Sequence, residues 1–254
     1  MNPRLAIVAV FLLIAACGDD DGAVTTEATT TTTSATTTTA ATTTTTTAPA
    51  STSTTVPKRP FRILALGDSY TIGESVAEAD RWPVQLGRAL EDAGWPPVEV
   101  EIVARTGWTT SELDRGIDNA DPQGPYDLVT LLIGVNNQYR GLDPEQYRTE
   151  FAALLDRARG FSAGPVLVVS IPDWGVTPFA SRSDPATVAA EIDLFNEIGR
   201  EGSLAADVPF VDITPISRSD DPSLVARDGL HPSGAQYTAW VDVILPVALD
   251  LVQP

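Results

Sequence analysis

The stretch Leu64-Ala65-Leu66-Gly67-Asp68-Ser69-Tyr70 determines how the rest of this 254-residue chain is interpreted. An apolar run over residues 61–66, typical of a buried strand, ends abruptly there in a Gly-Asp-Ser turn. In α/β proteins the ligand sites lie at the carboxyl ends of the strands, which is where such a turn would place a hydroxyl. Ser69 is therefore a candidate nucleophile.

A serine needs a base to remove its proton, and the usual base is a histidine that a carboxylate orients. The chain contains one histidine, in Arg227-Asp228-Gly229-Leu230-His231-Pro232. A tight turn there would bring the Asp228 carboxylate to Nδ1 of His231 and leave Nε2 free to face Ser69. Two members of a catalytic triad would then lie on one loop.

Two further apolar runs end in groups that could hold the oxyanion formed when a carbonyl is attacked. Residues 98–104 lead into Thr106-Gly107-Trp108, and residues 128–133 lead into Gly134-Val135-Asn136-Asn137. A glycine lets its backbone N–H approach a ligand closely, and an asparagine side chain provides a second donor. Together with the backbone N–H of Ser69, these segments supply three donors.

These four segments resemble the SGNH (GDSL-type) hydrolase superfamily of esterases and lipases. Its signature residues are a Ser in Gly-Asp-Ser, a Gly after the second strand, an Asn in Gly-x-Asn-Asp and a His in Asp-x-x-His. They fall here, in order, on Ser69, Gly107, Asn136 and His231. The resemblance covers about residues 58–254, and it implies a triad of Ser69, Asp228 and His231 and an oxyanion hole of Ser69, Gly107 and Asn136.

The chain departs from the family pattern at two positions. Tyr70 stands where Gly-Asp-Ser-Leu has its leucine, a position that we expect only to pack, and Asn137 replaces the family aspartate. An amide can still accept hydrogen bonds, so the second change affects the bracing of the loop and leaves Asn136 in place. The candidate substrate-binding residues are Asp68, Tyr70, Asn137 and Trp174.

Trp174 lies in the segment Pro172-Asp173-Trp174-Gly175-Val176-Thr177-Pro178-Phe179, which follows an apolar run over residues 166–171. If that run is a strand, the segment lies at its carboxyl end and lines the cleft. An exposed Trp174 and Phe179 there could bind an acyl chain or the face of a sugar. They could equally cover the edge of the core.

Strand and helix patterns alternate along the rest of the chain. Strands are expected over residues 61–66, 98–103, 127–134, 166–171 and 210–213, the second at an edge of the sheet and the third buried on both faces. Helices are expected over residues 82–93, 109–120, 143–158, 184–198 and from 233 onward, the last interrupted or ended near Pro246. The pattern predicts a three-layer α/β/α sandwich with a central parallel sheet, of the flavodoxin-like type.

Composition narrows the classes of function. With 43% hydrophobic residues the chain can bury one sizeable core, and a formal net charge of −18 argues against nucleic acid as a partner. One cysteine excludes intramolecular disulfides, and one histidine excludes the common His-rich zinc sites. We expect neither a metal nor a cofactor, although an Asp/Glu site for a hard cation stays open from sequence.

The first residues resemble an export signal. Arg4 precedes an apolar run over residues 5–16 that is too short to span a bilayer. Small residues directly before Cys17 resemble a bacterial lipoprotein signal, whose cleavage would leave a lipid-carrying Cys17 at the N-terminus; an ordinary signal peptide is the alternative. Residues 17–57 are Thr-rich and predict a disordered tether, glycosylated or bare. Residues 58–254 are the expected hydrolase domain, a lipid-anchored, extracytoplasmic monomer.

The predicted function is a serine esterase that acts through an acyl-enzyme on a small-molecule, lipid or glycan ester. Removal of acetyl groups from a glycan and cleavage of fatty acyl chains, as by a lysophospholipase or lipase, both stay open. The lack of a long apolar lid favours small acyl groups. The alternatives are a catalytically silent, anchored binding module on the same fold and a metal-dependent hydrolase.

Overall fold

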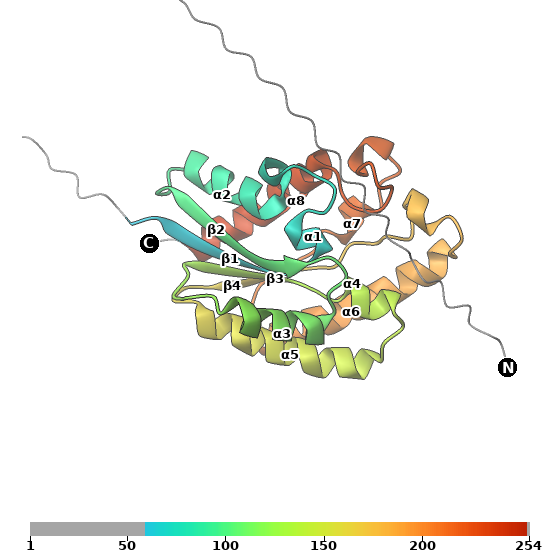
Figure 1. The fold of residues 1–254 in the computed structure, drawn as a ribbon, viewed down its shortest axis with the longest axis horizontal. Helices are drawn as coiled ribbons and strands as arrows, with labels where there is room; N and C mark the ends of the chain where they lie inside the picture. The colour runs from blue at the N-terminus through green and yellow to red at the C-terminus, as the bar shows by residue number, and fades with distance from the viewer. Residues whose placement is uncertain (1–58, 253–254) are drawn as a thin grey trace, which may run out of the picture. The chain divides into compact units, whose positions relative to one another are not determined.

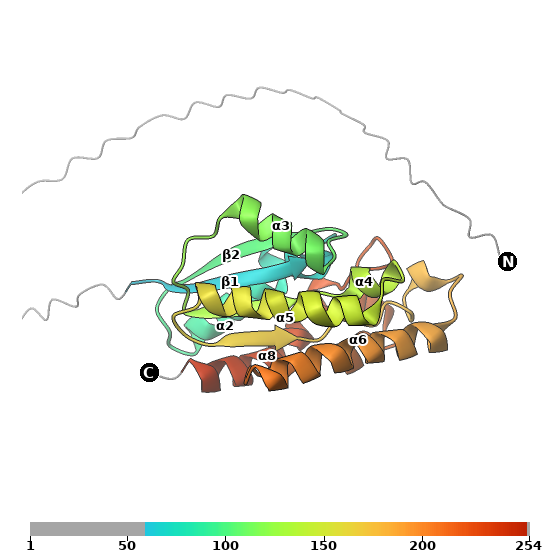
Figure 2. The ribbon, with the colours of Figure 1, turned by 90° about the horizontal axis from the view of Figure 1, so that it is seen from below.

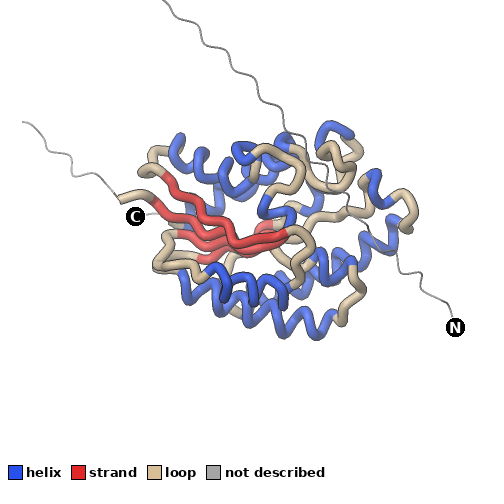
Figure 3. Tube along the Cα trace, in the orientation of Figure 1, coloured by secondary structure: helices blue, strands red, loops and turns tan. Residues whose placement is uncertain are grey.

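Five parallel strands form one sheet in the computed structural model, which describes residues 59–252. The order across the sheet is β2-β1-β3-β4-β5 (Figures 1 and 3). The strands are β1 (Phe61–Asp68), β2 (Val98–Arg105), β3 (Leu128–Leu132), β4 (Val166–Val169) and β5 (Phe210–Val211). Each neighbouring pair runs parallel. The predicted parallel α/β sheet is therefore confirmed.

The burial of each strand follows from its position in the sheet. β3 lies in the middle and is buried at every residue, because helices cover both of its faces. β2 lies at an edge, as its alternating sequence predicted, and it keeps several half-buried and exposed positions. β1 lies between these two strands, so its carboxyl end, Asp68, is enclosed on both sides.

Helices cover the two faces of the sheet and complete three layers (Figure 1). On one face α2 (Trp82–Asp92) packs against α8 (Gly234–Leu251), and on the other face α5 (Pro144–Phe161) packs against α3 (Thr110–Ala120) and α6 (Pro185–Ala205). Figure 2 views the molecule from this second face and shows α5 lying over the sheet. A capping box of Thr109 and Glu112 begins α3, and the side chains of Asp143 and Asp184 cap α5 and α6. These groups satisfy free N–H groups of the first turn of each helix.

Several short helices that the sequence did not reveal follow the strands. They are α1 (Ser69–Ile72), α4 (Val135–Tyr139) and α7 (Thr214–Ser217), with the 3₁₀ turns η1 (Glu78–Asp80), η2 (Pro178–Ala180) and η3 (Pro222–Leu224). Residues 134–137 had been interpreted as a loop. The structure instead starts a helical turn directly after β1 at Ser69 and after β3 at Val135.

The last helix corrects another expectation, because α8 continues through Pro246 to Leu251. A proline removes the hydrogen bond to the carbonyl four residues earlier, here that of Asp242. Both Pro246 and Asp242 lie on the exposed face of the helix, where water can bind the freed carbonyl. The opposite face packs Trp240, Ile244 and Ala248 into the core, which holds the helix together across the proline.

The export-signal, Cys17 and linker predictions concern residues 1–57, which lie outside the described residues, and they stay predictions. Among the described helices, none is both long enough and apolar enough to cross a membrane.

Candidate active site

Ser69 begins α1 at the carboxyl end of β1, where the sequence placed it. The Asp68 side chain caps this helix, since its Oδ1 accepts a hydrogen bond from Tyr70 N at 3.0 Å. Ser69 lines a pocket of about 120 Å³, the serine pocket, together with Gly107, Asn136 and His231 and the aromatic side chains Tyr70, Tyr139, Trp174 and Phe179. The fold thus brings four segments, distant in sequence, to one point.

Asp228 and His231 are joined within one tight loop. Nδ1 of His231 lies 2.6 Å from Oδ2 of Asp228, while Oδ1 accepts the backbone N–H groups of Leu230 at 2.9 Å and His231 at 3.0 Å. Partial burial raises the pKa of Asp228, but the hydrogen bonds from Ser75, His231 and Leu230 outweigh it and hold that pKa well below its ordinary value. The ionised carboxylate favours a proton on Nδ1 and leaves Nε2 as a base.

Ser69 and His231 both line the serine pocket, and the rings of Tyr70 and His231 lie 5.1 Å apart. Among the described residues no hydrogen bond joins Ser69 Oγ to His231. Such bonds are often long until substrate binds, so the lack of one here does not exclude this pair.

Ser75 is a contact of the candidate triad that the sequence did not reveal. Its Oγ donates to Asp228 Oδ2 at 2.6 Å, across 153 positions of sequence. Ser75 also adopts a left-handed backbone with φ of 66°, which is uncommon for a residue other than glycine. A serine in a surface turn carries no sequence signal that would single it out.

Gly107 and Asn136 line the serine pocket at the ends of β2 and β3. Gly107 has φ of 84°, a conformation that glycine adopts readily, and among the described residues its N–H has no acceptor. Its carbonyl accepts a hydrogen bond from Arg140, which also pairs with Glu112 at 3.1 Å. These contacts fix the turn that carries the free N–H.

The Asn136 amide is held in one orientation. Its Nδ2 donates to Trp108 O at 3.0 Å and lies 3.4 Å from Asp68 Oδ2. Burial raises the pKa of Asp68 to about 7. The hydrogen bonds from Tyr70 and Asn136 lower this pKa, but burial has the larger effect. Asp68 is completely buried and does not line the serine pocket, so it contacts Asn136 rather than the space open to substrate.

Asn137 is likewise directed away from the pocket and braces the neighbouring loop. Its Oδ1 accepts from Thr110 N at 3.0 Å, and its Nδ2 donates to Thr110 Oγ1 at 2.7 Å. Thr110 in turn donates to Glu150 on α5. The loop is thus still braced although Asn137 replaces the family aspartate. The sequence led us to expect that Asp68 and Asn137 contact substrate, but neither residue lines the serine pocket.

Three aromatic side chains form one wall of the serine pocket. Trp174 is 8% exposed and donates from Nε1 to Gln138 Oε1 at 2.7 Å, whereas Tyr139 is 55% and Phe179 48% exposed. Ring centroids are 5.3 Å apart for Tyr139 and Trp174 and 6.0 Å for Trp174 and Phe179. Tyr139 had been missed because α4 was interpreted as a loop. Of the four candidate substrate-binding residues, only Tyr70 and Trp174 line the pocket.

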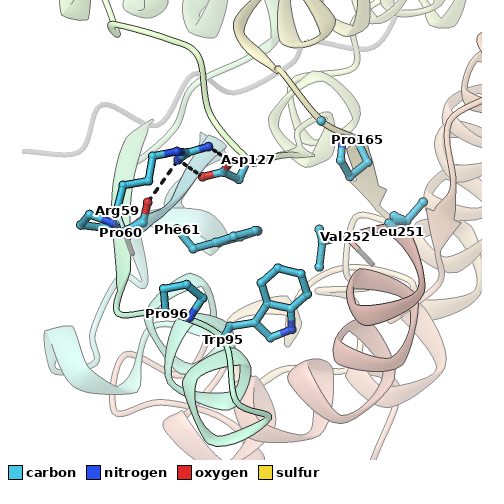
Figure 4. A pocket seen from close by; sticks show the side chains of 10 residues that line it. Arg59, Pro60, Phe61, Trp95, Pro96, Asp127, Pro165, Leu251 and Val252 are labelled. Carbon is cyan, nitrogen blue, oxygen red and sulfur yellow. Dashed lines mark hydrogen bonds and ion pairs between the residues drawn. The ribbon is translucent and has the colours of Figure 1, made fainter. Parts of the chain in front are cut away.

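A larger hollow of about 420 Å³, the amino-end hollow, lies where the strands begin (Figure 4). It is lined by Arg59, Phe61, Trp95, Asp127, Pro165 and Val252, among others. Phe61 and Trp95 pack edge to face at 5.2 Å, and Arg59 pairs with Asp127 at 2.5 Å (Figure 4). Its charged groups therefore neutralise each other. Within residues 59–252 no three His, Cys, Asp or Glu side chains are grouped to hold a metal ion.

Comparison with known proteins identifies the family of this chain. Residues 65–239 match the model of the GDSL-like lipase/acylhydrolase family. The GDSL lipase Rv0518 of Mycobacterium tuberculosis is 27% identical over 204 residues, which cover 75% of this chain and 83% of that protein.

Solved structures that share the fold include a lipase and a carbohydrate acetylesterase family member. The lipase Lip_vut3 from a goat rumen metagenome has a TM-score of 0.61 at 17% identity, covering 76% of this chain and 100% of its own. A carbohydrate acetylesterase family member from Sinorhizobium meliloti has a TM-score of 0.58 at 20% identity, covering 76% and 99%. The chain belongs to the GDSL-like lipase/acylhydrolase family, and it is a serine hydrolase that acts on ester bonds.

Proposed function

We propose that Ser69, His231 and Asp228 hydrolyse a carboxylic ester by way of an acyl-enzyme. The observation that carries this proposal is the meeting of Ser69, Gly107, Asn136 and His231 on one pocket, with Asp228 bound to the far nitrogen of the imidazole. This arrangement supplies a nucleophile, a base oriented by a carboxylate, and donors for an oxyanion.

In the first half of the reaction, His231 Nε2 takes the proton of Ser69 Oγ as that oxygen bonds to the ester carbonyl carbon. The carbonyl oxygen becomes an oxyanion that the backbone N–H groups of Ser69 and Gly107 stabilise. The Asn136 amide joins them by exchanging its long 3.4 Å bond to Asp68 for the oxyanion. The bond from carbon to the alcohol oxygen then breaks, and His231 returns its proton to the departing alcohol.

In the second half, His231 removes a proton from a water molecule that attacks the acylated Ser69. The tetrahedral intermediate collapses, the proton returns to Ser69 Oγ, and the carboxylic acid leaves. Throughout both halves Asp228 stays ionised and stabilises the imidazolium, which its low pKa allows.

The serine pocket supports a small, uncharged acyl group as substrate. Its volume of about 120 Å³ is comparable with the cavity of about 150 Å³ that accepts a benzene molecule. Among the described residues, those that line it include no Asp, Glu, Lys or Arg. An acetyl group of a glycan fits this space fully. The chain of a lysophospholipid or a triglyceride would have to continue outward over the exposed rings of Tyr139 and Phe179.

Covalent labelling tests the nucleophile. A fluorophosphonate probe should label the wild-type protein at Ser69, and Ser69→Ala should lose both labelling and turnover of p-nitrophenyl acetate while its circular dichroism spectrum is unchanged. Turnover that persists in Ser69→Ala would refute the assignment. A wild-type protein that is neither labelled nor active would instead identify a catalytically silent binding module.

A series of esters tests the acyl group. We expect kcat/KM to fall as the acyl chain of p-nitrophenyl esters is lengthened from acetate to palmitate, with an acetylated glycan included as a natural type of substrate. A maximum at long chains would contradict the small pocket and indicate a lipase.

We also propose that the protein is exported, carries lipid on Cys17 and acts as a monomer outside the cytoplasm. Support comes from the apolar run that ends in small residues before Cys17. Incorporation of a labelled fatty acid into the wild-type protein but not into Cys17→Ala would test this anchor.

A further inference from the structure

Ser75 joins the two halves of the catalytic machinery. It follows Ser69 closely in sequence, after the helical turn α1 that the nucleophile begins. Its hydroxyl reaches Asp228, which lies on the loop of the catalytic histidine, at 2.6 Å. The bond therefore connects the segment that carries the nucleophile with the segment that carries the base.

The hydroxyl of Ser75 completes the hydrogen bonding of the Asp228 carboxylate. An ionised carboxylate has about four acceptor positions. Oδ1 accepts the N–H groups of Leu230 and His231, and Oδ2 accepts His231 Nδ1 and Ser75 Oγ. With all four filled by donors of fixed position, the carboxylate has no freedom to rotate, and the imidazole bound to it keeps one orientation.

The backbone of Ser75 indicates that the side chain is there for this contact. Its φ of 66° lies in the left-handed region, where a Cβ is unfavourable and glycine is free of strain. Turns of this kind commonly contain glycine, asparagine or aspartate. Here the strained position carries a hydroxyl, and that hydroxyl is bound to the triad. Strain of this kind is often found at functional sites.

We infer that Ser75 is a positioning residue that holds the Asp228–His231 loop in register with Ser69. The inference rests on the proposed function of these three residues. Ser75 is not among the residues that line the serine pocket, so it acts through Asp228 and does not touch substrate.

Two substitutions separate the hydroxyl from the backbone strain. Ser75→Gly removes both, and Ser75→Ala removes the hydroxyl but keeps the Cβ. Because a hydrogen bond to a charged group is lost in each, kcat for p-nitrophenyl acetate should fall about tenfold in both, with KM unchanged. The rate of fluorophosphonate labelling should fall by the same factor. The melting temperature of Ser75→Gly should equal or exceed that of Ser75→Ala.

The matched control is Asp207→Gly, which relaxes another exposed left-handed residue, with φ of 54°, away from the serine pocket. Its kcat should equal that of the wild type. The inference is overturned if Ser75→Gly keeps full kcat and labelling rate, or if its loss of activity is matched by a loss of melting temperature. A wild-type protein that is not labelled at all would refute the proposed function instead.

Discussion

The two ends of the sheet differ in what their polar groups do. At the amino end, the hollow is the larger of the two, yet Arg59 and Asp127 neutralise each other there, and the described residues that line it include no other charged side chain. At the carboxyl end, a smaller pocket gathers a hydroxyl, an imidazole and an N–H with no acceptor among the described residues. The site that we propose follows the unmatched polar groups rather than the volume, whereas the size of a cavity alone would have indicated the opposite end of the sheet.

The largest expected effect on kcat/KM comes from substituting one of two aspartates, Asp228 at the carboxyl end and Asp127 at the amino end. Asp228→Asn should lower kcat/KM by about 10⁴, because the amide carries no charge to stabilise the imidazolium and its NH₂ group can donate to Nδ1 of His231, which favours the wrong tautomer. Asp127→Asn, which weakens the pair with Arg59 and the bond to Arg62 N at 2.9 Å, should leave kcat/KM within about twofold of wild type. Steady-state kinetics on p-nitrophenyl acetate measures both.

Equal losses of activity in these two variants would show that the amino-end hollow takes part in catalysis, and the comparison would fail. A normal melting temperature in Asp228→Asn would confirm that its loss of activity is chemical rather than a failure to fold.

A smaller effect separates two adjacent asparagines within the carboxyl end. Asn136→Ala should lower kcat by about 10²–10³ through the loss of an oxyanion donor, with little change in stability. Asn137→Ala should lower the free energy of unfolding by about 1–3 kcal/mol, because Thr110 N, which lies in the interior, loses its acceptor. Kinetics and urea unfolding of both variants, measured together, would assign each residue its part.

The opposite result, full kcat in Asn136→Ala and lost kcat in Asn137→Ala, would contradict this assignment. Asn137 would then be the oxyanion donor, and Asn136 would be the residue that braces the loop.

The smallest effect concerns the pH dependence of stability. Two carboxylates at opposite ends of the sheet, Asp127 and Asp68, have pKa shifts of opposite sign and therefore change the stability in opposite directions as the pH rises. The pKa of Asp127 is lowered, mainly by its hydrogen bond from Arg59, so its contribution to stability is lost as the pH falls. Burial raises the pKa of Asp68 from an ordinary 3.8 to about 7. The folded state therefore holds a proton that the unfolded state releases, and stability declines as the pH rises from about 4 to about 7.

Asp68→Asn removes this titration. The decline in free energy of unfolding between pH 4 and pH 7 should be smaller in Asp68→Asn than in the wild type, as measured by urea unfolding at each pH. An equal or steeper decline in the variant would mean that Asp68 is not the group that titrates in this range.

The sequence predicted the sheet and the motifs because both rest on local patterns. The apolar runs that became β1, β3 and β4 are continuous, and the capping residues Asp143 and Asp184 mark where helices start. The segments with Ser69, Gly107, Asn136 and His231 were found because each follows a strand or uses the single histidine.

The features that could not be predicted from the sequence depend on contacts between distant segments. α1 and α4 have four and five residues, too few for a helical period, so Tyr139 gave no sign of facing the pocket. The bond from Ser75 to Asp228 spans 153 positions and exists only once the sheet has formed. α8 continues through Pro246 because its buried face packs into the core, and the helix propensities of single residues do not include such packing.

Both ends of the described chain line the amino-end hollow, Arg59 and Phe61 at its start and Leu251 and Val252 at its finish. In Figure 4 these side chains lie around the same space, at the opposite end of the strands from Ser69. A carrier protein or a solid support joined directly at residue 59 or residue 252 would therefore be attached at the end of the domain remote from the serine pocket.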